Sequence, residues 1–111
     1  MDYLLLVWID GSVALDPEEA ASLGPNVLAW VDEMDGRGVR VHGSPLSPAR
    51  DATTVTVRKG EATVVNGLGG ERTDYVAGFD VLKVADADEA VEVASKHPVA
   101  RFGRTELRPL L

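Results

Sequence analysis

The opening segment, residues 3–9, most constrains the fold, because its seven side chains are all apolar. Successive side chains of a strand point to opposite faces of a sheet, so a strand of this composition has two apolar faces. One face carries Leu4, Leu6 and Trp8, and the other carries the alternating residues. A sheet that contains this strand therefore needs cover on both sides.

The length of the chain limits what can supply that cover. A chain of 111 residues forms one domain, spanning residues 1–111, with one core. Its sequence predicts only two helices, and these can cover one face of a sheet. We therefore expect a second copy of the chain to cover the other face, which gives a homodimer.

Charge and composition exclude several classes of partner. The net charge is −7, and the 11 Lys and Arg residues are scattered among 18 Asp and Glu. Nucleic acids and anionic membrane surfaces both require a concentrated positive patch, so we expect neither as a partner. The longest apolar run is too short to cross a bilayer and follows no basic leader, so we expect a cytoplasmic protein.

Metal ions and other cofactors are not expected either. The absence of cysteine excludes disulfides, thiolate zinc sites and cysteine nucleophiles. The two histidines, His42 and His97, lack the His-Glu-x-x-His spacing of a helical zinc site. The glycine-rich residues 67–70 lack the Gly-Lys-Ser/Thr that completes a phosphate loop, so we expect them to allow a tight backbone path.

The first helix has a clear start and a predicted interruption. Asp16 is an N-cap, Pro17 fits the first helical position, and an acidic residue follows three positions after the cap. Apolar residues continue at helical spacing to Gly36. Within that span, the Gly24-Pro25 pair predicts a kink or a break, because proline removes a backbone donor and clashes with the preceding turn.

The remaining elements complete an α+β order. A second helix starts at the cap-plus-acid pattern of residues 86–89 and must end before Pro98. Alternating or β-branched runs predict strands at residues 3–9, 39–42, 53–58, 61–65, 78–84 and 104–110, with a hairpin turn at Lys59-Gly60. The order β-α-β, hairpin, β-α-β predicts a ferredoxin-like split βαβ fold with an inserted β-hairpin.

Residues 65–79, VNGLGGERTDYVAGF, crowd glycines and charged residues between two apolar runs, as binding loops do. Gly67, Glu71, Gly78 and Phe79 in this stretch match a known signature: Asp-Gly-Pro-Phe, then Glu, then Lys-Glu, then Gly-Gly-Phe. The stretch thereby resembles the YCII-related family in its DGPF branch. The opening MDYLLLVW, the segment DADEAVEVASKHP and the closing ELRPL also fall in family order, so the resemblance covers nearly the whole chain.

The resemblance implies a dimeric α/β barrel, in which two sheets pack face to face and leave clefts for a small organic ligand. Some YCII-related proteins resemble lyases or dehydrochlorinases that use a His-Asp dyad. The first hypothesis is therefore cofactor-free, lyase-like acid-base chemistry. The DGPF branch lacks an assured dyad, and its genes commonly accompany extracytoplasmic-function sigma factors, so the alternative is a non-catalytic ligand-binding or regulatory module.

His42, His97 and Asp74 are the candidate catalytic residues. If the two valines of residues 39–42 face the helices, His42 projects onto the cleft side together with Arg40. A histidine there can take and return a proton, because its ordinary pKa is ~6.5. The alternatives are that His42 is exposed or lies in a dimer interface, and that His97 satisfies the last carbonyls of the second helix.

Arg40, Glu71 and Asp80 are the candidate ligand-binding residues. Glu71 and Asp74 share a face if a helical turn forms between them, and otherwise they are solvated loop residues. An acid inside a strand, such as Asp80, is costly unless it is paired, with Arg40 or Arg108 as the expected partner, or lies at an exposed edge. A histidine hydrogen-bonded to one of these acids in a closed pocket favours the enzyme, whereas isolated histidines favour the module.

Overall fold

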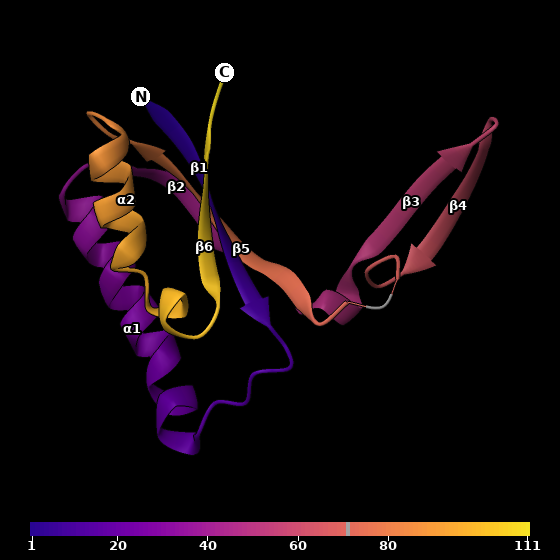
Figure 1. The fold of residues 1–111 in the computed structure, drawn as a ribbon, viewed down its shortest axis with the longest axis horizontal. Coiled ribbons are helices and arrows are strands. Elements are labelled where there is room, and N and C mark those ends of the chain that lie inside the picture. The colour runs from indigo at the N-terminus through magenta and orange to yellow at the C-terminus, as the bar shows by residue number, and fades with distance from the viewer. Residues whose placement is uncertain (71) are drawn as a thin grey trace.

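Strands and helices both build the fold in the computed structural model, which describes residues 1–70 and 72–111 (Figure 1). The strands are β1 (Asp2–Asp10), β2 (Arg40–Pro45), β3 (Thr53–Arg58), β4 (Glu61–Asn66), β5 (Asp74–Lys83) and β6 (Arg104–Pro109). The helices are α1 (Pro17–Gly36) and α2 (Ala87–Ser95), and the 3-10 turns are η1 (Ala49–Asp51) and η2 (Pro98–Arg101).

Four strands form one antiparallel sheet in the order β2-β5-β1-β6. The first and last strands of the chain are neighbours, and β5 pairs with both β1 and β2. This is the strand order of a ferredoxin-like split βαβ unit, with β3 and β4 inserted as a hairpin. The predicted α+β fold class is confirmed.

Both helices pack on one face of the sheet, so β1 is buried unequally on its two sides (Figure 1). Tyr3, Leu5 and Val7 point toward the helices and are buried. The other set, Leu4, Leu6 and Trp8, is only half-buried. We call the sheet face that carries this second set the open face, and no helix of the described chain covers it.

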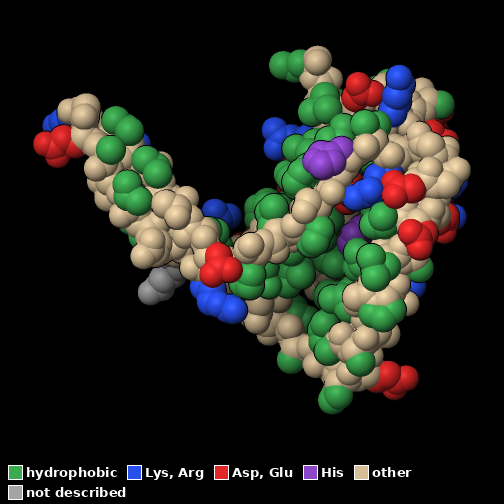
Figure 2. Space-filling model, turned by 180° about the vertical axis from the view of Figure 1, so that it is seen from behind, with side chains coloured by type: hydrophobic (Ala, Val, Ile, Leu, Met, Phe, Trp, Pro, Cys, Tyr) green, Lys and Arg blue, Asp and Glu red, His purple; other side chains and the backbone are tan. Residues whose placement is uncertain are grey.

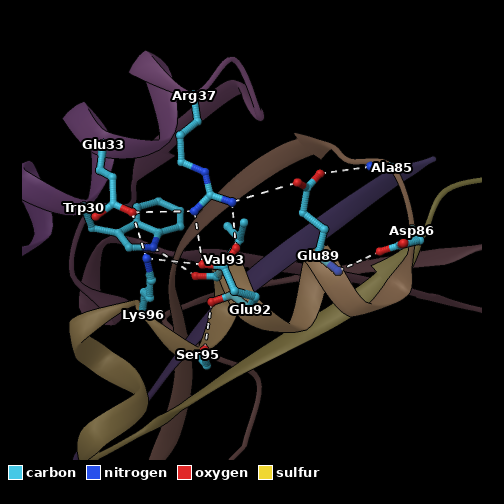
Figure 3. A network of polar contacts seen from close by, with 10 residues as sticks. All are labelled: Trp30, Glu33, Arg37, Ala85, Asp86, Glu89, Glu92, Val93, Ser95 and Lys96. Atoms are coloured by element: carbon cyan, nitrogen blue, oxygen red, sulfur yellow. Dashed lines mark hydrogen bonds and ion pairs between the residues drawn. The ribbon is translucent and has the colours of Figure 1, made fainter.

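A polar network joins the two helices along their exposed edges (Figure 3). The indole Nε1 of Trp30 donates to the carbonyl of Val93 over 3.1 Å, which ties α1 to α2 inside the core. Outside it, Arg37 contacts Glu92 at 2.6 Å. The hydrogen bond from Arg37 lowers the pKa of Glu92 to about 2. These contacts fix the spacing of the helices above the sheet.

The predicted break in the first helix is wrong, because α1 is continuous with Pro25 inside it. Asp16 forms the expected capping box with Glu19, which anchors the first turn. Ala21 and Pro25 both lie on the exposed side of the helix. The carbonyl that loses its proline partner can therefore bond to water, and packing of the opposite side holds the helix together.

The predicted alternation of residues 39–42 is also wrong, because β2 has a bulge after Arg40. Arg40 pairs with Leu82 on the helix side, whereas His42 pairs with Val81 on the open face. Val41 is the extra residue and is 63% exposed rather than packed against the helices. A bulge of this kind re-aims side chains without changing the strand order, and its position cannot be read from periodicity.

The inserted hairpin stands apart from the sheet (Figure 1). It turns at Lys59 and Gly60, whose φ angles of 51° and 79° confirm the predicted turn. The predicted start of the following strand is wrong, because β5 begins at Asp74 rather than at residue 78. The last part of the signature stretch is therefore strand, which extends because it pairs with the end of β1.

Candidate functional site

A cavity of about 330 Å³ lies between α1 and the sheet. One wall is an aliphatic strip of α1, and the other is formed by β1, β2 and β5. The aliphatic residues that line it are Val7, Ile9, Leu23, Val27, Leu28, Val31, Pro45, Ala77 and Val99. Hydrophobic side chains are correspondingly dense in the body of the molecule around the hollow (Figure 2). A site of this size and character suits a small, mostly apolar molecule.

Arg40 and Asp80 form an ion pair on the cavity wall. The Nε of Arg40 donates to Oδ1 of Asp80 over 2.7 Å, and the Nη1 of Arg40 donates to Oδ1 of Asp35 over 3.1 Å. Asp80 is 6% exposed. Burial raises the pKa of the Asp80 carboxyl, and Arg40 opposes that rise. The sequence prediction that Asp80 pairs with Arg40 is confirmed.

Gly43 makes room for this carboxylate. It lies opposite Asp80 in the register of β2 and β5. A Cβ atom at position 43 would overlap Oδ1 of Asp80 and would lie 2.7 Å from the carbonyl oxygen of Phe79. Sequence reasoning missed this residue. A glycine inside a predicted strand was the available signal, since it marks a close approach of another group to the backbone.

His97 is the second polar group of the cavity. It is 4% exposed and lies at the N-cap of η2, where its Nδ1 accepts from the backbone N–H of Val99 over 3.1 Å. Its ring meets Trp30 edge-on, with centroids 4.7 Å apart. Burial lowers the pKa of His97 to about 4, so its imidazole is neutral at pH 7. Because Nδ1 accepts a hydrogen bond, the single proton sits on Nε2, which is a donor.

The structure does not bring the other candidates to the cavity. His42 is exposed, and its ring lies edge-on to Phe79 with centroids 5.7 Å apart. Asp74 forms an ion pair with Arg104 at 3.1 Å at the far end of β5. Glu71 lies outside the described residues.

Two absences hold for the described part of the chain. No hydrogen bond there joins either histidine to Asp74 or Asp80, so it forms no direct His-Asp dyad. Residues 1–70 and 72–111 also contain no cluster of three or more His, Cys, Asp or Glu that could hold a metal ion. Arg40, Asp80 and His97 are therefore the candidates that share the cavity.

No helix in the described ranges has both the length and the apolar character needed to cross a membrane.

The split βαβ sheet with both helices on one face and a cavity under the first of them defines a class of small α+β domains. Comparison with protein families makes this specific: the model of the YCII-related domain matches residues 1–111, and the chain belongs to that family. The DGPF branch stays a prediction. Among curated proteins, none matches the chain.

A solved structure shares the fold. It is 5-chloro-2-hydroxyhydroquinone dehydrochlorinase (TftG) from Burkholderia phenoliruptrix AC1100 in complex with 2,5-dihydroxybenzoquinone. The match covers 100% of this chain and 94% of that chain, with a TM-score of 0.53 and 13% sequence identity. At that identity the likeness establishes the fold.

Proposed function

We propose that the cavity binds a small organic molecule and performs cofactor-free acid-base chemistry on it. The observation that carries this proposal is the presence of Arg40, Asp80 and His97 on a mostly apolar cavity wall. Polar groups buried among aliphatic side chains cost stability, and they are concentrated where a reaction or a ligand uses them. The dehydrochlorinase activity of the structurally similar TftG supports lyase-like chemistry.

Asp80 and His97 suit different roles in an elimination. Asp80 has a raised pKa, so its carboxylate is a stronger base than an ordinary aspartate and can accept a proton from a carbon beside a carbonyl. His97 presents a neutral Nε2–H, which can donate to the carbonyl oxygen as negative charge develops there. The electron pair then returns from that oxygen and expels the leaving group with its bonding electrons. Arg40 positions the Asp80 carboxylate throughout.

The active form in this proposal is a homodimer. The open face of the sheet carries Leu4, Leu6 and Trp8 half-exposed, together with Phe79 and Val81 from β5. A second copy that packs its own open face on this one would bury both apolar surfaces, as in a dimeric α/β barrel. The cavity lies on the other side of the sheet, between β1 and α1, so dimerisation leaves its polar residues in place.

The test uses 2,5-dihydroxybenzoquinone and a panel of other single-ring hydroxylated or carbonyl compounds as probes. We expect at least one probe to raise the melting temperature of the parent protein. Asp80→Asn keeps the size of the side chain, and His97→Asn replaces the capping nitrogen by an oxygen acceptor. Both variants should lose most of that rise, because each removes the reactive group. His42→Ala is the matched control and should keep it, since His42 lies outside the cavity. Equal responses from all three variants would place the binding site elsewhere.

A non-catalytic binding or regulatory module is the second candidate. The observation that favours it is the engagement of His97 Nδ1 by the Val99 N–H, with no His-Asp hydrogen bond in the described residues. Such a histidine binds a ligand oxygen well but is not poised as a general base. Prolonged incubation of the protein with each probe it binds, followed by mass spectrometry, separates the candidates. A new product that requires Asp80 supports the enzyme, and unchanged probe supports the module.

A further inference from the structure

The hairpin of β3 and β4 has an apolar face that its own chain leaves open. The register pairs Val55 with Val64 and Val57 with Ala62, which places these four side chains on one face. The three valines are 57–63% exposed. The opposite face is mostly polar and carries three threonines, Arg58, Glu61 and one valine, Val65. We call the face of Val55, Val57, Ala62 and Val64 the valine face. Figure 2 shows hydrophobic side chains along the projecting hairpin, which is well separated from the body of the molecule.

The base of the hairpin is closed by hydrogen bonds between its own two ends. The backbone N–H of Gly67 donates to the carbonyl of Ala52 over 2.6 Å, and the hydroxyl of Thr54 donates to the carbonyl of Gly67 over 2.7 Å. Beyond this base, the two strands contact mainly each other. A two-stranded hairpin without cover is at best marginally stable in water, so the ordered hairpin requires another surface.

A second copy of the chain offers a surface of matching character. The open face is apolar along β1 and β5, and the charged residues beside it on β6 are paired within the protomer. Glu106 accepts from Nε1 of Trp8 over 3.0 Å and pairs with Arg108 at 3.2 Å. An uncharged stripe of valines can therefore pack beside this face without leaving a charge buried and unpaired.

The area of the interface also favours the hairpin as part of it. Four strands of ordinary spacing and length give the open face a footprint of roughly 400 Å², so two such faces together bury roughly 800 Å². That is half of the about 1,600 Å² of a standard stable interface. Two hairpins, each with an equal area on the partner, add roughly 800 Å² and bring the total to the standard size.

We propose that the hairpin is a dimerisation arm, whose valine face packs against a second copy of this chain and receives that copy's arm in return. The inference rests on the homodimer proposed above and goes beyond it. Face-to-face packing of the sheets alone would leave both valine faces in water. Reciprocal arms bury the valine face of each protomer in one symmetric contact. The partner is thus identical in sequence, and the arm extends the contact from the open face.

The experiment compares Val57→Lys with Thr56→Lys in the full chain. The two positions are adjacent in β3 and lie on opposite faces of the hairpin, so the substitutions add the same charge to the same strand. Val57 is 57% exposed in the protomer, so neither lysine should disturb folding, which circular dichroism checks. Sedimentation velocity across a concentration series should show a dimer dissociation constant at least tenfold weaker for Val57→Lys and little changed for Thr56→Lys.

Hydrogen exchange provides a second test of the arm. Amides of residues 54–65 should be protected in the parent dimer and exchange rapidly in Val57→Lys at concentrations where it is monomeric, while amides of β1 and β5 stay protected in both. If the parent, Val57→Lys and Thr56→Lys all dimerise equally, the arm is overturned but the homodimer still stands. A parent that is monomeric at tens of micromolar overturns both. Neither result touches the cavity residues, which the probe experiments test separately.

Discussion

The guanidinium of Arg40 lies 2.7 Å from the carboxylate of Asp80, on the wall of a cavity that is otherwise mostly aliphatic. A bulge in β2 makes this contact possible, because it turns Arg40 toward the helices and His42 away from them. Two polar groups are thereby held in an apolar site where packing alone would place hydrocarbon. Such a pair serves ligand chemistry better than it serves stability.

Removing one partner of this pair should destabilise the protein, and replacing both should not. Arg40→Met leaves Asp80 buried without its donor and should lower the free energy of unfolding by about 3 kcal/mol. Adding Asp80→Leu to that variant should recover most of the loss while abolishing the response to probes. Urea denaturation measures both effects. Arg37→Met, which breaks an exposed ion pair, is the control and should shift the midpoint little. A double variant no more stable than Arg40→Met would contradict this account.

Gly43→Ala should be strongly destabilising. The added methyl group would overlap the Asp80 carboxylate and press on the backbone of Phe79, so β2 would have to move away from β5. Overpacking of this kind costs about 1–3 kcal/mol. Thermal unfolding measures the cost, with Gly36→Ala as the control, because nothing lies within 4 Å of a Cβ built there. Similar melting temperatures for the two variants would show that β2 yields easily.

His97 should make stability depend on pH in the mildly acidic range. Its folded pKa of about 4 lies below the ordinary value of 6.5, so the unfolded chain binds the proton first as pH falls. The contribution of His97 to the free energy of unfolding is fully present above pH 6.5. It falls by on the order of 3 kcal/mol as the pH drops from 6.5 to 4. His97→Asn keeps an oxygen to cap η2 but cannot titrate, and it should flatten the curve. If His97→Asn and the parent lose the same stability between pH 6.5 and pH 4, other groups cause the loss.

Pro25→Ala should stabilise the protein. Alanine restores the backbone N–H that α1 lacks at this position and removes a steric conflict with the preceding turn, and the side chain is exposed. Part of that gain is offset, because alanine also raises the conformational entropy of the unfolded chain. We therefore expect the free energy of unfolding to rise by about 1–2 kcal/mol. Asn26→Ala, at the next exposed position, gives the effect of helix propensity alone. A loss of stability in Pro25→Ala would show that the proline is favourable where it stands.

The order of elements could be predicted from the sequence because local signals agree with the fold. The N-cap at Asp16, the turn at Lys59-Gly60 and the two apolar sets of β1 all lie where the structure has them. The exceptions are positions where tertiary packing overrides a local rule. Helix α1 continues through Pro25 because its opposite side is packed, and β5 begins early because β1 offers a partner for Asp74.

The candidate site was predictable only in part. The cost of burying an acid in a strand pointed to Asp80 and its pairing with Arg40, which the structure confirms. Placement of Arg40 beside His42 depended on perfect alternation along residues 39–42, and one extra residue in β2 turned Arg40 to the helix side, while His42 lies on the face away from the helices as expected. The engagement of His97 by the Val99 amide depends on the turn that follows α2, and no periodicity encodes it.

The unequal sides of β1 have a consequence for spectroscopy. The two tryptophans of the chain lie on opposite sides of the sheet, since Trp8 is on the open face and Trp30 is buried on the inner side of α1. The indole of Trp30 is in edge contact with His97, and a protonated imidazole quenches indole emission. Trp8→Phe would therefore leave a fluorophore that reports the charge of His97, and Trp30→Phe one whose emission maximum shifts when two copies meet. Light emission alone could then distinguish protonation of His97 from association of the chains.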